Sequence, residues 1–120
     1  MSDGTMVDRD ALARTTTIDL TTTGRKSGQP ATVEIWWFRV GGRFIITGTP
    51  GRRDWYANVL TNPEISIRAN GVEFRATARV VDDAKFRTRV FTDAAISWYR
   101  SQTELDRLVS EAPMIEVLID

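Results

Sequence analysis

The chain has 120 residues, and its 16 basic and 16 acidic side chains give a formal net charge of zero. With 42% hydrophobic and 27% charged residues, the composition is that of a single globular domain spanning residues 1–120. The balanced charge gives no reason to expect nucleic acid as a partner. Cysteine and histidine are both absent, which excludes disulfides, thiolate nucleophiles, a Ser-His-Asp triad and the usual zinc sites. If the protein is an enzyme, a cofactor or a few carboxylates, lysines and tyrosines must carry the reaction, and we expect no metal.

Residues 1–14 lack the apolar stretch of a signal peptide, and we expect a flexible or short helical segment there. No run of about 18 apolar residues is present, which predicts that no helix crosses a membrane. We therefore expect a cytoplasmic protein. Peripheral contact with a membrane stays open, although no feature of the sequence supports it.

Alternating and β-branched residues predict six strands. They are expected at residues 15–23, 33–40, 43–48, 65–69, 72–80 and 114–119. Gly41-Gly42 and Asn70-Gly71 predict two-residue hairpin turns, so neighbouring strands should pair antiparallel. The run Trp36-Trp37-Phe38 breaks the alternation, which indicates that both faces of its strand are covered. Six strands joined in this way favour a small closed barrel over an open sheet with exposed edges.

Helices are expected between some of these strands, so the predicted fold is mainly β with a short inserted helix and a C-terminal helical pair. The first helix, at residues 54–61, begins with Asp54 as a candidate N-cap. Apolar residues recur every four positions from Phe86 to Trp98, which predicts a second helix with Trp98 in the core. The sequence SQTE at residues 101–104 fits a capping box that opens a third helix.

Residues 24–28, which read GRKSG, are the first candidate binding segment. The glycines let the backbone approach a ligand, and Arg25 and Lys26 with the hydroxyl of Ser27 suit a phosphate. The same residues also describe an exposed basic hairpin loop. Taken alone, this second interpretation is the more frequent one, because short basic motifs occur by chance.

The segment 48–53, which reads GTPGRR, leads into the helix at Asp54 and is the second candidate. Free amides at a helix N-terminus attract anions, and Arg52 and Arg53 would strengthen that attraction. A capping Asp54 would already occupy these amides, so a capped helix with solvated arginines is equally open.

Aromatic residues are the third candidate group. Trp36 and Trp37 point to opposite faces of one strand, so one of them can form a wall for a planar ligand. Tyr56 and Tyr99 are the only phenols, and apart from the two lysines they are the only side chains suited to donate a proton near neutral pH.

Read in order, TTTGRKSGQP, TVEIWWF and GGRFIITGTPGRRDWYANVLTNPEISI resemble the deazaflavin-dependent nitroreductase family. This family is a branch of the split β-barrel flavin/deazaflavin oxidoreductase superfamily and uses coenzyme F420. The resemblance covers residues 18–80 well and implies a six-stranded split barrel with the phosphate tail of the cofactor along the GRKSG segment. The cofactor-binding residues that it implies are Arg25, Lys26, Ser27 and Gln29 for the tail, Thr47, Gly48, Thr49, Pro50 and Gly51 for the ring edge, and Trp55 and Asn58 beside the ring.

The resemblance implies an oxidoreductase in which reduced F420 delivers a hydride to a quinone, an activated alkene or a nitroaromatic compound. Tyr99 or solvent would supply a proton. The aromatic residues that we expect to line the substrate pocket are Trp36, Trp37 and Trp98.

Two residues differ from the pattern of the family. Ala31 stands where members usually carry a basic residue, and Glu34 stands where a proline is frequent in the best-studied branch. Three alternatives therefore stay open: an FMN-binding split-barrel reductase, a non-catalytic binder of a flavin or hydrophobic ligand, and a barrel without a cofactor. The superfamily contains homodimers and this branch also contains monomers, so both states stay open.

Overall fold

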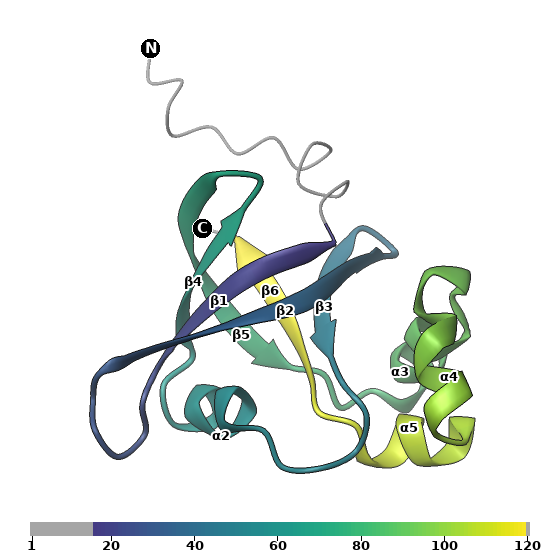
Figure 1. The fold of residues 1–120 in the computed structure, drawn as a ribbon. Coiled ribbons are helices and arrows are strands. Elements are labelled where there is room, and N and C mark those ends of the chain that lie inside the picture. Colours follow the sequence, from purple (N-terminus) through teal and green to yellow (C-terminus); the bar gives the residue numbers. More distant parts are fainter. Residues whose placement is uncertain (1–15, 120) are drawn as a thin grey trace.

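The structure, a computed structural model, describes residues 16–119. Six antiparallel strands close into a barrel in the order β1-β2-β3-β6-β5-β4 (Figure 1). This confirms the six-stranded antiparallel barrel that the sequence predicts, whereas the segment expected at residues 1–14 lies outside the described residues. The strands are β1 (Thr17–Thr23), β2 (Pro30–Val40), β3 (Arg43–Thr47), β4 (Glu64–Ala69), β5 (Val72–Val80) and β6 (Met114–Ile119).

Strand pairing places the GRKSG segment at the tip of the first hairpin. Thr23 pairs with Pro30, so residues 24–29 form the connection between β1 and β2. The barrel closes because β1 also pairs with β4, where Leu20 lies opposite Ile67. The last strand, β6, lies between β3 and β5.

The hairpin between β4 and β5 forms as the sequence predicts. Asn70 and Gly71 have φ values of 52° and 76°. Both values are positive, as a type I′ turn requires, and asparagine and glycine are the residues that adopt this region most readily.

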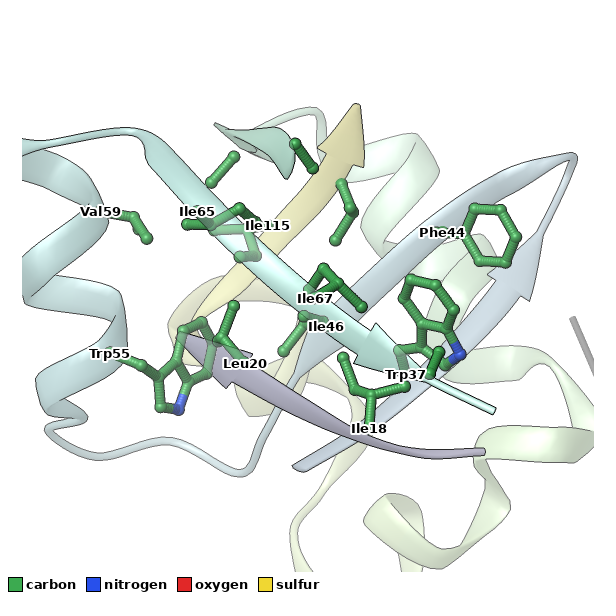
Figure 2. Close-up of a cluster of buried hydrophobic side chains, with 14 residues drawn as sticks. Ile18, Leu20, Trp37, Phe44, Ile46, Trp55, Val59, Ile65, Ile67 and Ile115 are labelled. Carbon is green, nitrogen blue, oxygen red and sulfur yellow. The ribbon is translucent and has the colours of Figure 1, made fainter. Parts of the chain in front are cut away.

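The barrel interior is filled by large apolar side chains (Figure 2). Trp37 stacks on Phe44 with ring centroids 4.4 Å apart, and Figure 2 shows this pair at one end of the cluster. At the other end, Trp55 and Val59 come from the helix α2 (Asp54–Thr61) and are both buried. The helix α2 therefore contributes side chains to the barrel core.

A second core lies outside the barrel, between β2, β3 and the C-terminal helices. Figure 1 shows these helices grouped on one side of the barrel. Phe38 and Val40 of β2 are buried here, whereas Trp37 of the same strand is buried inside. This confirms that both faces of β2 are covered. The helical elements are α3 (Ala84–Thr92), the 3-10 turn η2 (Ala94–Ile96), α4 (Ser97–Gln102) and α5 (Leu105–Glu111).

The predicted continuous helix up to Trp98 is wrong. The helix α3 ends at Thr92, and Asp93 has extended backbone angles. This break changes which residues face the core, so Ile96 and Tyr99 are buried while Trp98 is 51% exposed. In place of the predicted helical pair, the structure has three short α-helices and a 3-10 turn.

The predicted capping box at residues 101–104 is also wrong. The Ser101 hydroxyl donates to the carbonyl of Trp98 within α4. The N-cap of α5 is Glu104, without a side-chain hydrogen bond. Within residues 16–119, none of the helices is long and apolar enough to cross a membrane.

Arg87 of α3 links the helical layer to the end of β5. Its guanidinium donates hydrogen bonds to the carbonyls of Val81, Leu108, Val109 and Ala112. Burial lowers the pKa of Arg87, since desolvation disfavours its charged form. The carbonyl groups at the C-terminal end of α5 compensate, because they carry partial negative charge.

Candidate functional site

Glycine and local hydrogen bonds shape the segment Gly24–Gly28, called the GRKSG loop below. The Gly24 amide donates to the carbonyl of Gln29 at 2.8 Å, and the Gly28 amide donates to the carbonyl of Gly24 at 2.9 Å. The Ser27 hydroxyl accepts from the Gln29 amide at 3.1 Å. A Cβ atom at residue 24 would lie 2.5 Å from this hydroxyl oxygen, so a larger residue there would displace the Ser27 side chain from this bond. Ser27 and Gln29 thus help to hold the loop in shape.

The loop leaves hydrogen-bond donors available to a ligand. Among residues 16–119, no protein group accepts from the backbone amides of Lys26 and Ser27. Arg25 and Lys26 are exposed beside them. An open hollow of about 290 Å³ lies against this surface. It is lined by Gly24, Arg25, Lys26, Ser27, Ala31, Asp54 and Asn58.

Arg25 is held in place by contacts with residues of α2. The Oδ1 atom of Asn58 accepts from the backbone amide of Arg25 at 3.1 Å and from its guanidinium at 2.9 Å. The amide nitrogen of Asn58 donates to the Thr22 hydroxyl of β1 at 3.0 Å. A carboxylate oxygen of Asp54 lies 3.3 Å from the guanidinium. The orientation of Arg25 is therefore set by two residues of α2, Asn58 and Asp54.

The start of α2 differs from the prediction at Asp54. The N-cap residue is Arg53, and no side chain caps the helix. Asp54 is the first helical residue, and its side chain is 90% exposed and turned toward Arg25. The amides of the first turn are thus not blocked by a side chain. A second hollow of about 180 Å³ lies here and shares Arg25 and Asp54 with the first.

Arg53 organises the turn that precedes α2. Its guanidinium donates to the Thr49 carbonyl at 3.0 Å, to the Thr49 hydroxyl at 3.2 Å and to the Arg52 carbonyl at 3.2 Å. Gly51 has a φ of 140°, which favours glycine. Gly48, Thr49 and Pro50 of this turn are partly exposed, so a ligand can reach them, as the predicted contacts to the ring edge require.

Thr47 is not on that surface, although it was predicted to contact the ring edge. The whole residue, backbone included, is 2% exposed, and its hydroxyl donates to the Pro113 carbonyl at 2.6 Å. Its strand pairs with β6, where Thr47 lies opposite Met114. Thr47 is thus part of the barrel wall.

Trp36, Trp98 and Tyr99, called the aromatic cluster below, come together in the structure. Trp36 and Trp98 are two of the three tryptophans that we expect to line the substrate pocket. The rings of Trp36 and Trp98 meet edge to face, 5.6 Å apart, and their residues are 41% and 51% exposed. Tyr99 lies beneath them, with its ring 6.4 Å from that of Trp36. The cluster therefore consists of two exposed indole rings that cover the buried phenol of Tyr99.

Burial raises the pKa of Tyr99, because desolvation disfavours the phenolate, and the Arg53 guanidinium partly opposes this change. Tyr99 therefore keeps its proton at neutral pH.

Trp37 and Trp55 are not placed as predicted. Both belong to the barrel core and are 2% and 6% exposed, so neither ring lines an open hollow. Trp55 and Asn58 do share one face of α2, but this face packs against the barrel. The physical reason is the large apolar area of the two indoles, which is more favourably buried inside the barrel.

The sequence prediction missed Thr22 as a residue that shapes the site, and it did not predict how Arg53 shapes it. Thr22 is 2% exposed and follows Ile18 and Leu20 on the inward-facing side of β1. A polar residue on an apolar face must find a partner, and this signal was visible in the sequence. No local signal indicated that Arg53 would fold back onto the turn.

Comparison with known proteins agrees with the fold and identifies the family. A family model described as F420H(2)-dependent quinone reductase matches residues 2–111, and the chain belongs to this family. The resemblance seen in the sequence is thereby confirmed.

A curated relative is the F420H(2)-dependent quinone reductase Rv1261c of Mycobacterium tuberculosis, which is 35% identical over 66 residues. The match covers 52% of this chain and 44% of that protein, so it spans less than half the length of the relative.

Solved structures share the fold at low sequence identity. An F420 reductase is 20% identical with a TM-score of 0.65, and the match covers 96% of this chain and 94% of that one. A FAD-binding protein from Mesorhizobium loti is 16% identical with a TM-score of 0.65, covering 93% and 86%. These likenesses establish the split-barrel fold.

Proposed function

We propose that this protein is an oxidoreductase that binds reduced coenzyme F420 and transfers a hydride from it to a quinone. The observation that carries the proposal is the GRKSG loop, where an oriented Arg25 lies beside Lys26 and two free backbone amides. Membership of the F420H(2)-dependent quinone reductase family supports both the cofactor and the acceptor.

The residues present fit a cofactor with a phosphate-bearing tail and a planar ring. Two cationic side chains and the amides of Lys26 and Ser27 line an open hollow, which suits a phosphate. The turn at residues 48–51 offers backbone groups to the polar edge of a ring. The aromatic cluster offers exposed ring surfaces.

The reduced cofactor supplies the hydride when it is bound. Arg25 and Lys26 bind its phosphate, and residues 48–51 orient the ring edge. Trp36 and Trp98 give the acceptor an apolar surface and exclude water from one side of it. Tyr99 holds a phenolic proton at neutral pH, which a quinone needs in addition to the hydride to become a hydroquinone.

FMN is a second candidate cofactor, favoured by one specific observation. Ala31 lines the loop hollow where a further cation would otherwise stand, so Arg25 and Lys26 are the two cations among its lining residues. Two cations suit a single phosphate. Titration of the purified protein with F420 and with FMN separates the two candidates, and binding without oxidation by any quinone would instead support a storage role.

The double variant Arg25→Ala with Lys26→Ala tests the loop. We expect the Kd for F420 to rise by about 100-fold or more, since each hydrogen bond to a charged group contributes about 1.5–3 kcal/mol. The free energy of unfolding should fall by less than about 2 kcal/mol. Titration and urea unfolding measure the two effects.

Lys85→Ala with Arg107→Ala is the matched control, because it removes the same two charges from exposed positions on α3 and α5. This control should leave the Kd within about twofold. An unchanged affinity in the loop variant, together with impaired folding, would show that the loop is structural and refute the proposed site.

A further inference from the structure

Asn58 is a buried polar residue on an otherwise apolar helix face. It is 3% exposed and lies on the same face of α2 as Trp55 and Val59. A buried amide is costly unless its donor and acceptor are satisfied, so its partners explain its presence. Those partners lie outside α2, namely Arg25 of the GRKSG loop and Thr22 of β1.

The hydrogen-bond partners of Asn58 fix which way its side-chain amide is turned. The oxygen faces two N–H donors of Arg25, and the nitrogen faces the Thr22 hydroxyl, which fixes the orientation of the amide. One oxygen thus holds both the backbone and the side chain of Arg25. Asn58 joins the loop, β1 and α2 at a single buried point.

The hold on Arg25 has a consequence for binding. A free arginine side chain loses about 2 kcal/mol of rotamer freedom when a ligand immobilises it. Asn58 has already removed much of this freedom in Arg25, whereas no described residue bonds to the ammonium group of Lys26. The guanidinium has five N–H donors, so donors remain for an anion after its bonds to Asn58 and Asp54. The loop therefore has one fixed and one adaptable cation.

We propose that Asn58 is a positioning residue that holds Arg25 of the GRKSG loop in its ligand-binding orientation. The inference rests on the proposed function of the loop. It differs from the role implied by the family resemblance, which places Asn58 beside the ring. In the structure, Asn58 lies beneath the loop, so its effect on the cofactor passes through Arg25.

A double-mutant cycle between Asn58 and Arg25 tests the proposal. Asn58→Leu keeps the number and branching of the side-chain heavy atoms and removes both polar groups. We expect it to raise the Kd for F420 by about tenfold in the unmodified background and by less than about twofold in the Arg25→Ala background. Equal losses in both backgrounds would overturn the inference, because Asn58 would then act without Arg25.

Two further variants separate positioning from folding. Asn58→Asp keeps oxygen acceptors for Arg25, and it should hold the Kd within about threefold of the unmodified protein. Thr22→Val removes the other partner of Asn58 at an equally buried position, and it should leave the Kd within about twofold. If Thr22→Val raises the Kd as much as Asn58→Leu does, any disturbance of this buried site weakens binding. The bonds between Asn58 and Arg25 would then have no special role, which contradicts the proposal.

Hydrogen exchange gives a readout that needs no cofactor. In the unliganded protein the Arg25 amide is bonded to the side chain of Asn58, so it should exchange faster by about tenfold in Asn58→Leu and stay protected in Asn58→Asp. Unchanged exchange in Asn58→Leu would overturn the inference. If Arg25→Ala alone leaves the F420 affinity unchanged, both the inference and the proposed loop site fail, whereas a weakened Arg25→Ala without coupling refutes the inference alone.

Discussion

The GRKSG loop and the aromatic cluster stand at two places along the same strand and are built in opposite ways. The loop leads into β2 at Pro30, and Trp36 lies further along that strand. Arg25 of the loop is held by directional hydrogen bonds to Asn58 and an ion pair. Trp36 is held by edge-to-face ring contacts.

The difference matches the ligand that we propose for each region. A phosphate requires donors at fixed positions, so the loop is restrained before a ligand arrives. A planar acceptor requires area and shape, which exposed rings supply without fixed polar partners. The two regions should therefore respond independently to substitution.

The largest expected effect contrasts the neighbours Trp36 and Trp37. Trp37→Ala should lower the free energy of unfolding by about 3–5 kcal/mol, because it empties part of the barrel core. Trp36→Ala should lower the free energy of unfolding by less than about 1 kcal/mol, since the residue is 41% exposed. Denaturant unfolding measures both, and a similar cost for the two would place Trp36 in the core and remove it from the site.

A smaller effect is expected on the acceptor. Trp36→Ala and Trp98→Ala should each raise the KM for a quinone by about tenfold while leaving the Kd for F420 within about twofold. Trp98→Phe keeps an aromatic ring, so it should raise the KM for the quinone less than Trp98→Ala does. A parallel loss of F420 affinity in these variants would show that the aromatic cluster and the loop are not independent.

The smallest effect concerns the pH dependence of stability. Burial raises the pKa of Tyr99, so the folded protein holds the phenolic proton more tightly than the unfolded chain does. The stability that results is fully present below the unfolded pKa, about 10, and is lost as the pH rises through the folded pKa. Tyr99→Phe should therefore change the free energy of unfolding little at pH 7. At higher pH, the variant should lose less of this free energy than the unmodified protein does.

Unfolding midpoints measured from about pH 7 to pH 11 check this prediction. Arg53→Gln provides a second test, because it removes the cation that favours the phenolate and should raise the pKa of Tyr99 further. An identical alkaline loss in Tyr99→Phe and in the unmodified protein would contradict the prediction.

The strands were predictable because their signals are local. Residues 72–80 alternate regularly and follow Asn70-Gly71, and the observed strand β5 has the predicted bounds. The helix break at Asp93 was not predictable from periodicity, since it depends on which side chains the outer face of β2 and β3 buries. Alternation also puts Trp36 and Trp37 on opposite faces without showing which face becomes the barrel interior.

For the site, the sequence indicated the kinds of side chain better than their roles. Arg25 and Lys26 were recognised as a basic pair, and the structure places them at an open hollow. Asp54 was predicted to cap its own helix, but it pairs with Arg25 from a segment 29 residues away. Asn58 likewise bonds across 33 residues. Such contacts depend on the closed barrel and leave no local pattern.

The contacts of Arg87 bear on how sequences of this fold can diverge. Its guanidinium reaches only backbone carbonyls among the described residues, so the side chains at positions 81, 108, 109 and 112 do not provide its hydrogen bonds. Substitutions that preserve the backbone path at these positions can accumulate without breaking the connection between α3 and α5. The helix α4 lies between them in the chain, so the exposed Trp98 can be exchanged for another residue while the backbone frame that carries it stays unchanged.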